Sequence, residues 1–310
     1  MPERRIYYGG QAVIEGVMIR GPSSMAVACR KPDGDIIVRS EPLGGVYTGF
    51  VRRIPFIRGI VVMWETLALG FRALMYSADV AIGVEEQRAS PLQMRLTMFF
   101  ALAVALLIVF AVPSLVNGPL EDLFGSELVV VTVEGILRLA IVVGYVAAIG
   151  LLPDVRRIYA YHGAEHKSIH ALENGDRLEP ESVQKYPTAH VRCGTSFLLT
   201  VGVVSILVFA PLGNPDLWLR VLSRIALIPV IAAIAYEIIR LGGAFESSPI
   251  TRALMWPNLA LQSLTTRQPD DKQVEVAIRA LEEVLVTEGA VERAGTAEAE
   301  AATKATPPLD

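Results

Sequence analysis

The stretch YHGAEHKSIH, at positions 161–170, holds three of the four histidines of this chain. His162 and His166 are four residues apart, so on an α-helix they lie about 40° apart on one face and can bind one metal ion. Glu165 flanks that face. The spacing matches the inverted zinc-protease signature, in which two histidines bind the metal and the glutamate is the general base that acts on water. His170 would lie roughly 12 Å further along the helix than His162, too far to share the ion.

The alternative for this stretch is a polar helix end at a membrane surface, where the histidines and Lys167 complement the charge of lipid headgroups. All four histidines fall between positions 162 and 190. This clustering favours a metal site, because histidine-rich tracts are typical of metal binding.

His190 and Cys193 form a second pair of candidate ligands. An imidazole and a thiolate three residues apart are plausible soft ligands, and the intervening chain has turn signals that allow it to fold back. Alternatively, Cys193 only begins a membrane helix and its thiol is buried. Four protein ligands (His162, His166, His190 and Cys193) would close a structural zinc site, whereas three ligands and water would make it catalytic.

Two further acidic residues need partners. Glu15 lies in an apolar, glycine-flanked segment and is either a remote ligand or acid/base group, or one half of a salt bridge with Arg20 or another local arginine. Glu134 and Arg138, four apart in an apolar stretch, predict a structural intramembrane pair, with a transport path as the alternative.

The composition places these residues in a membrane protein. The chain has 310 residues, 52% of them apolar, and a mean hydropathy of +0.45, too apolar for a soluble protein of this size. Residues 96–116 and 194–215 carry no Asp, Glu, Lys or Arg, and each segment is long enough to span a bilayer. Residues 128–152 and 217–241 are also long enough but contain charges. Four transmembrane helices are therefore expected.

Loop charges predict the orientation. Residues 1–95 contain 12 Lys and Arg and residues 153–193 contain six, whereas residues 117–127 contain none. Both termini and the histidine segment are therefore expected in the cytoplasm. Cys29 and Cys193 both fall on that side, so no disulfide is expected. No basic tract indicates nucleic acid binding.

The fold expected is mainly α: a polytopic helical membrane protein with a small N-terminal β unit and a C-terminal amphipathic helix. The β unit rests on two β-prone runs around the turn Pro32-Asp33-Gly34, and the C-terminal helix on a capping box formed by Asp270 and Gln273. The predicted segments are a cytoplasmic β unit (1–50), an amphipathic juxtamembrane helix (51–90), a transmembrane hairpin (91–152), a cytoplasmic histidine-rich loop with the helix (153–193), a second hairpin (194–241), a cytoplasmic segment with the amphipathic helix (242–286) and a disordered tail (287–310).

Four blocks of this sequence, YYGGQAVIEGVMIRGP, YHGAEHKSIHALENG, RCGTSFLLT and LTTRQPDDKQVEVAI, resemble the YqhQ family of bacterial multi-pass membrane proteins, which are catalogued as predicted metal-dependent enzymes. The resemblance runs from about residue 8 to residue 285. It implies a bacterial inner-membrane protein and makes the histidine helix the functional centre, but it implies no substrate.

The function expected is a membrane-embedded metal-dependent enzyme, a hydrolase of amides or esters, with its site at the cytoplasmic face. Zinc is the expected ion, held by His162 and His166, with Glu165 activating water and His190 or Cys193 completing the site. One alternative is a non-enzymatic scaffold or assembly factor with a structural metal site, whose β unit and C-terminal helix bind protein partners. A transporter is the third reading, and the lipid bilayer is the partner common to all three.

Overall fold

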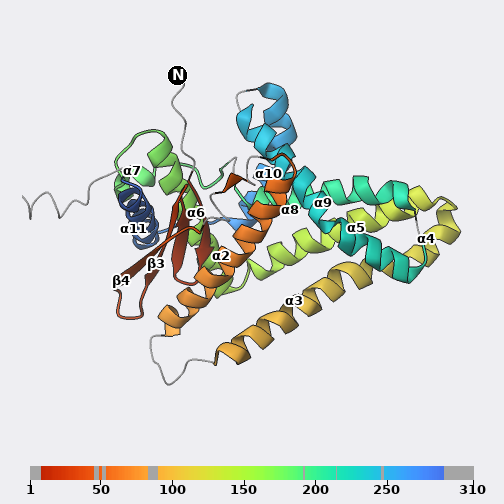
Figure 1. Ribbon diagram of the computed structural model, residues 1–310, viewed down its shortest axis with the longest axis horizontal. Coiled ribbons are helices and arrows are strands. Elements are labelled where there is room, and N and C mark those ends of the chain that lie inside the picture. The colour runs from red at the N-terminus through yellow and green to blue at the C-terminus, as the bar shows by residue number, and fades with distance from the viewer. Residues whose placement is uncertain are drawn as a thin grey trace, which may run out of the picture.

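The computed structural model describes residues 8–44, 49–50, 54–82, 90–190, 193–213, 215–245 and 248–289. It is mainly helical, with one small antiparallel sheet near the N-terminus. Figure 1 shows two parts, which we call the lobe and the arm. The lobe contains the sheet and the helices that cover it, and the arm is a set of long helices that extends away from them.

The sheet has four strands in the order β1-β2-β3-β4: β1 (Gly9–Val13), β2 (Gly16–Arg20), β3 (Ser24–Arg30) and β4 (Ile36–Pro42). The predicted turn joins β3 to β4, where Gly34 has φ 97° and its N–H donates to the carbonyl of Lys31 at 2.9 Å. The prediction of a β unit here is confirmed. It missed the β1–β2 hairpin, because glycines and a central glutamate weaken the strand signal of residues 9–20.

Both faces of the sheet are covered. On one face, β2 and β3 pack against α6 (Pro153–Glu173) and α11 (Asp271–Thr287), and on the other against α2 (Ile57–Ile82). The two inner strands are therefore buried on both sides. The predicted capping box at Asp270 is confirmed at the start of α11, and the apolar stripe of that helix is buried in the lobe core. The predicted disordered tail lies largely outside the described residues.

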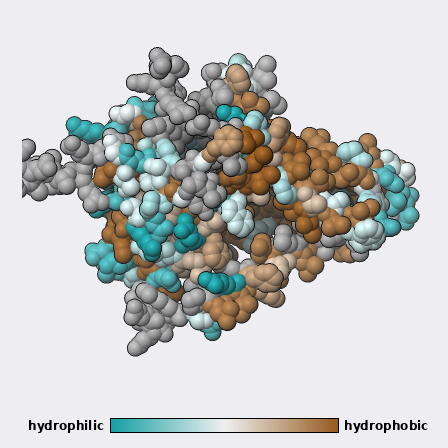
Figure 2. Space-filling model, in the orientation of Figure 1, coloured by the Kyte–Doolittle hydropathy of each residue, from teal (hydrophilic) through white to brown (hydrophobic). Residues whose placement is uncertain are grey.

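The arm consists of two helical hairpins. The first is α3 (Pro91–Ser114), α4 (Asn117–Phe124) and α5 (Glu127–Ile149), and the second is α8 (Thr195–Phe209), η3 (Ala210–Leu212) and α9 (Leu217–Ala244). The turns of both hairpins lie at the same end, since Gly213 packs against the side chain of Glu127. Figure 2 shows apolar residues over most of the visible face of the arm, with polar residues at its far end.

Three helices of the described chain are long and apolar enough to cross a membrane: Ile57–Ile82, Glu127–Ile149 and Trp218–Gly242. Two of the four expected spans are among them. The other two correspond to shorter apolar stretches, Arg95–Val109 and Phe197–Leu212. Part of the charge-free segment 194–215 is taken up by a 3₁₀ turn that contains Pro211, so α8 itself has only 15 residues.

Helix α2 exposes the apolar stripe that the sequence predicts. Trp64 and Leu67 are 65% and 62% exposed, whereas the buried face carries Leu69 and otherwise small or polar residues such as Glu65 and Gly70. Close packing on the sheet requires the small side chains, because a Cβ at Gly70 would lie 2.2 Å from the side chain of Gln11. The large apolar side chains therefore remain available to contact lipid.

Candidate functional site

Helix α6 positions three of the four histidines. Pro153 begins the helix at a position where its missing N–H costs nothing, and Asp154 lies in the first turn. The helix continues unbroken to Glu173, so His162, His166 and His170 follow one another at intervals of four residues. The middle of this helix is buried in the lobe, and His166 and His170 lie against the carbonyls of Thr188 and Ala189.

Backbone carbonyls fix the orientation of the first two imidazoles. The Nδ1 atom of His162 lies 2.9 Å from the Thr265 carbonyl oxygen, and that of His166 lies 2.5 Å from the Thr188 carbonyl oxygen. A carbonyl only accepts, so each Nδ1 carries a proton, and in the neutral form of either ring Nε2 is the nitrogen that keeps a lone pair. Burial also lowers the pKa of His166 well below its usual value, which keeps the imidazole in the neutral form that binds metals.

Cys193 completes a three-residue donor set with these histidines. Its Sγ lies 3.2 Å from Nε2 of His162, and one donor atom from each of His162, His166 and Cys193 lies within 4.8 Å of the other two. Zn–N and Zn–S bonds in a tetrahedral site imply ligand separations of about 3.5 Å. Two imidazoles and a thiol at this spacing can hold a zinc-type ion after small movements.

Glu165 lies beside the donor set in an unusual environment. One oxygen accepts a hydrogen bond from the Gly10 N–H, and the other, Oε2, is buried with no hydrogen-bond partner among the described residues. Burial raises the pKa of this carboxyl group to about 8; His162 lowers the pKa, Cys193 raises it and the Gly10 hydrogen bond lowers it. A Cβ at Gly10 would lie 3.0 Å from the carboxyl carbon, so the glycine permits this close approach.

The structure places His190 in a neighbouring group. His190 Nε2 lies 3.3 Å from the Glu173 carboxylate, and donor atoms of His170, Glu173 and His190 lie within 4.8 Å of one another. The rings of His166 and His190 are 5.7 Å apart. Of the four predicted ligands, the tight cluster therefore contains three, and His170 belongs to the neighbouring group.

The remaining candidates have structural partners. Glu15 forms an ion pair with Arg157 and accepts a hydrogen bond from Tyr161 at 3.2 Å, while Arg20 pairs with Glu65. The expected local pair with Arg20 is thus replaced by one that links the β1–β2 turn to α6.

Lys167 is buried and donates to the carbonyls of Gln184 and Tyr186, at 2.9 and 2.6 Å. This arrangement holds the 184–186 loop against α6, and burial lowers the pKa of the lysine. Lys167 therefore contacts protein carbonyls. The alternative of a polar helix end at a membrane surface had predicted that it would face lipid headgroups.

Several residues that shape the site carry no sequence signal. The side-chain amide of Gln262 binds both the N–H and the carbonyl of His190, each at 2.8 Å. Gln262 and Thr265 lie on α10 (Pro249–Thr265), a helix that the sequence analysis did not predict. Thr188 and Thr265 act through backbone carbonyls, which every residue type possesses.

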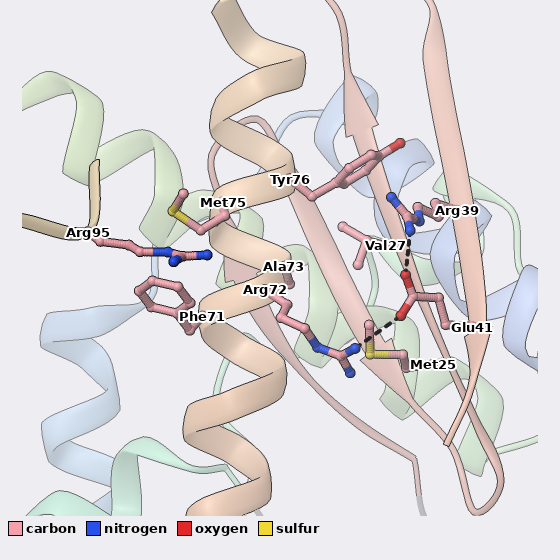
Figure 3. A pocket seen from close by; sticks show the side chains of 10 residues that line it. All are labelled: Met25, Val27, Arg39, Glu41, Phe71, Arg72, Ala73, Met75, Tyr76 and Arg95. Carbon is pink, nitrogen blue, oxygen red and sulfur yellow. Dashed lines mark hydrogen bonds and ion pairs between the residues drawn. The ribbon is translucent and has the colours of Figure 1, made fainter. Parts of the chain in front are cut away.

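A separate pocket lies between α2 and the sheet, away from the histidines (Figure 3). It has a volume of about 360 Å³, and Arg39 and Arg72 converge there on Glu41, at 2.8 and 3.4 Å. Arg95 reaches the same pocket from α3. None of the candidate ligands lines it.

Comparisons with known proteins identify the family. The profile of the family described as "Protein of unknown function (DUF1385)" matches residues 54–287. The chain is 35% identical over 300 residues to "Uncharacterized protein YqhQ" of Bacillus subtilis (strain 168), an alignment that covers 92% of this chain and 94% of that protein. No solved structure matches. The chain belongs to the DUF1385 family.

Proposed function

We propose that this protein is a membrane-embedded, metal-dependent hydrolase whose site lies where the lobe meets the base of the arm. Helix α6 begins four residues after α5 ends, and Cys193 lies two residues before the start of α8. The three candidate ligands thus belong to the segment that connects the two hairpins. A site in this position suits a substrate presented at a membrane surface.

Four helices of the arm, α3, α5, α8 and α9, cross the membrane in this proposal. The shared position of both hairpin turns supports it, as does the apolar surface of the arm (Figure 2). In this proposal the lobe and both termini lie in the cytoplasm, an orientation that the loop charges support. The membrane is the bacterial inner membrane.

One observation carries the catalytic part of the proposal: two carbonyl-oriented imidazoles and a thiol converge beside a buried glutamate, one oxygen of which has no hydrogen-bond partner in the described part of the chain. His162, His166 and Cys193 hold the ion. When bound, a zinc-type cation supplies Lewis acidity and lowers the pKa of water. In its ionised form, Glu165 would take a proton from the attacking water and return it to the leaving group of an amide or ester. Gly10 holds the other carboxylate oxygen in place.

The alternative is a scaffold with a structural metal site. The burial of His166 and Cys193 favours it, since structural sites are closed. In that case the metal only ties α6 to the start of α8, and Glu165 has no chemical role.

Substitution at two positions separates these functions. Glu165→Gln preserves size but removes the proton acceptor, so for an enzyme the metal content and fold persist while function falls by roughly a hundredfold or more. Function is measured as complementation of a deletion strain at matched protein levels, with metal content determined on the purified full chain. If Glu165→Gln complements fully while Cys193→Ser is metal-free and degraded, the site is structural and the hydrolase proposal is wrong.

A further inference from the structure

The interior of the arm contains a cavity of about 230 Å³. Most of its wall is apolar, with Val109 from α3 and Phe209 from α8 among the lining residues. Two arginines also line it: Arg138 on α5 is 9% exposed and Arg224 on α9 is 6% exposed. Charged groups inside an apolar helical bundle are costly to bury and commonly mark a binding or transport site.

The two arginines share one carboxylate. Glu134, fully buried on α5, accepts from Arg138 at 2.6 Å and from both terminal nitrogens of Arg224 at 2.6 and 2.9 Å. The sequences of α3 and α8 contain no Asp or Glu, and the other acidic residues of α5 and α9 are Glu127 and Glu237, each about two turns or more from this network. Helix α2 also lines the cavity, through Met63, and its nearby Glu65 is paired with Arg20. The centre of the arm therefore combines two guanidinium groups with one carboxylate.

This excess of positive charge in an apolar wall favours an anion that carries an aliphatic chain. Guanidinium groups bind carboxylates with paired, charge-assisted hydrogen bonds. The cavity is smaller than a typical site for a drug-sized ligand, so it accommodates a headgroup and the first part of a chain. Leu198 and Ile228 line the cavity and are also 49% and 42% exposed, so the rest of a chain can leave toward the surrounding lipid at this point.

We infer that this cavity binds the carboxylate of a long-chain fatty acid, with the carboxylate beside Arg138 and Arg224 and the chain directed between the helices. An anionic phospholipid has the same chemistry of one charge and aliphatic chains, and the experiment distinguishes the two. The inference is independent of the histidine site.

The test uses the delipidated full chain in neutral detergent, with oleate binding followed by native mass spectrometry. We expect one oleate per chain and at least tenfold weaker binding of methyl oleate, which has the same chain without the charge. Arg224→Gln should weaken oleate binding tenfold or more. Glu134→Gln should strengthen it, because this change removes the competing carboxylate; a role in packing alone would not make these two substitutions act in opposite directions.

Two further variants keep the result interpretable. Arg220→Gln, one turn earlier on α9, removes a guanidinium that donates to the Pro215 carbonyl and should leave oleate binding unchanged. Ser205→Leu fills the cavity from α8 with the charged network intact and should weaken binding tenfold. Equal binding of methyl oleate, unchanged binding by folded Ser205→Leu, or tenfold tighter binding of phosphatidylglycerol than of oleate would each overturn the assignment.

Discussion

His162 Nε2 lies 3.2 Å from Cys193 Sγ, although 31 positions separate the two residues. The contact joins the middle of α6 to the residue that leads into α8, and it brings a thiol to a helix face that already presents two histidines. His190, only three positions from Cys193, faces Glu173 instead. The donor set thus depends on the tertiary contact that brings Cys193, and not His190, to the first two histidines of α6.

Cobalt substitution tests this division of ligands. We expect the thiolate-to-cobalt absorption band in the wild type and in His190→Ala, because His190 lies outside the cluster of three. The band should be absent from Cys193→Ser and from His162→Ala, which each remove one ligand. A band lost in His190→Ala from a folded protein would show that the four-ligand site forms after all.

The hydrogen bonds of Gln262 predict a large effect on stability. Gln262→Leu leaves the N–H and the carbonyl of His190 without their partner in a buried setting, and we expect the free energy of unfolding to fall by about 2–5 kcal/mol. Gln268→Leu is the matched control. Gln268 is exposed, and within the described ranges its amide bonds the side chain of Gln184 alone, so we expect a change below about 0.5 kcal/mol. Thermal unfolding in detergent measures both, and equal effects would contradict the assigned role.

Two glycine-to-alanine substitutions, at Gly163 and at Gly144, should have different effects on stability. A Cβ at Gly163 would lie 2.2 Å from the Arg267 carbonyl oxygen, whereas a Cβ at Gly144 on α5 meets nothing within 4 Å. Gly163→Ala should therefore destabilise the protein by about 1–3 kcal/mol. Gly144→Ala should be neutral or stabilising by up to about 1 kcal/mol, since alanine is the better helix former. The difference in midpoint temperature between the two variants is the measurement.

The buried thiol of Cys29 should make the free energy of unfolding depend on pH in the alkaline range. Burial raises the pKa of this thiol to about 12, and the charge of Glu15 adds to the rise. Below pH 9 the thiol is protonated in both the folded and the unfolded chain. Between pH 9 and about 12 only the unfolded chain loses the proton, so this thiol lowers the free energy of unfolding by up to about 1.4 kcal/mol per pH unit. Cys29→Ala should reduce the slope; an identical slope in both proteins would count against the raised pKa.

The proposed topology makes a prediction at two positions. A reporter fused at Gly118, in α4, should read as external, and one fused at Asn174, after α6, should read as cytoplasmic. A cytoplasmic signal at Gly118 would reverse the orientation and place the histidines outside.

Local sequence determined those parts of the protein that depend on neighbours along the chain. The spacing of His162 and His166 placed both on one face of a helix, and Asp270 with Gln273 marked the start of α11. The turn at Gly34 could also be predicted from the local sequence. Each of these signals lies within a few residues of the chain, because helical periodicity, turn formation and helix capping depend on residues that are close in sequence.

Only the tertiary structure decided which residues form ion pairs and hydrogen bonds with residues far away in the sequence. Arg157 pairs with Glu15 across 142 positions, and Arg224 joins Glu134 across 90. The histidines are oriented by carbonyls of Thr188 and Thr265, whose side chains give no indication of that role. These contacts arise only when the sheet, α6 and α10 pack together, because closing such long loops is driven by burial of the whole core and not by any pair of residues.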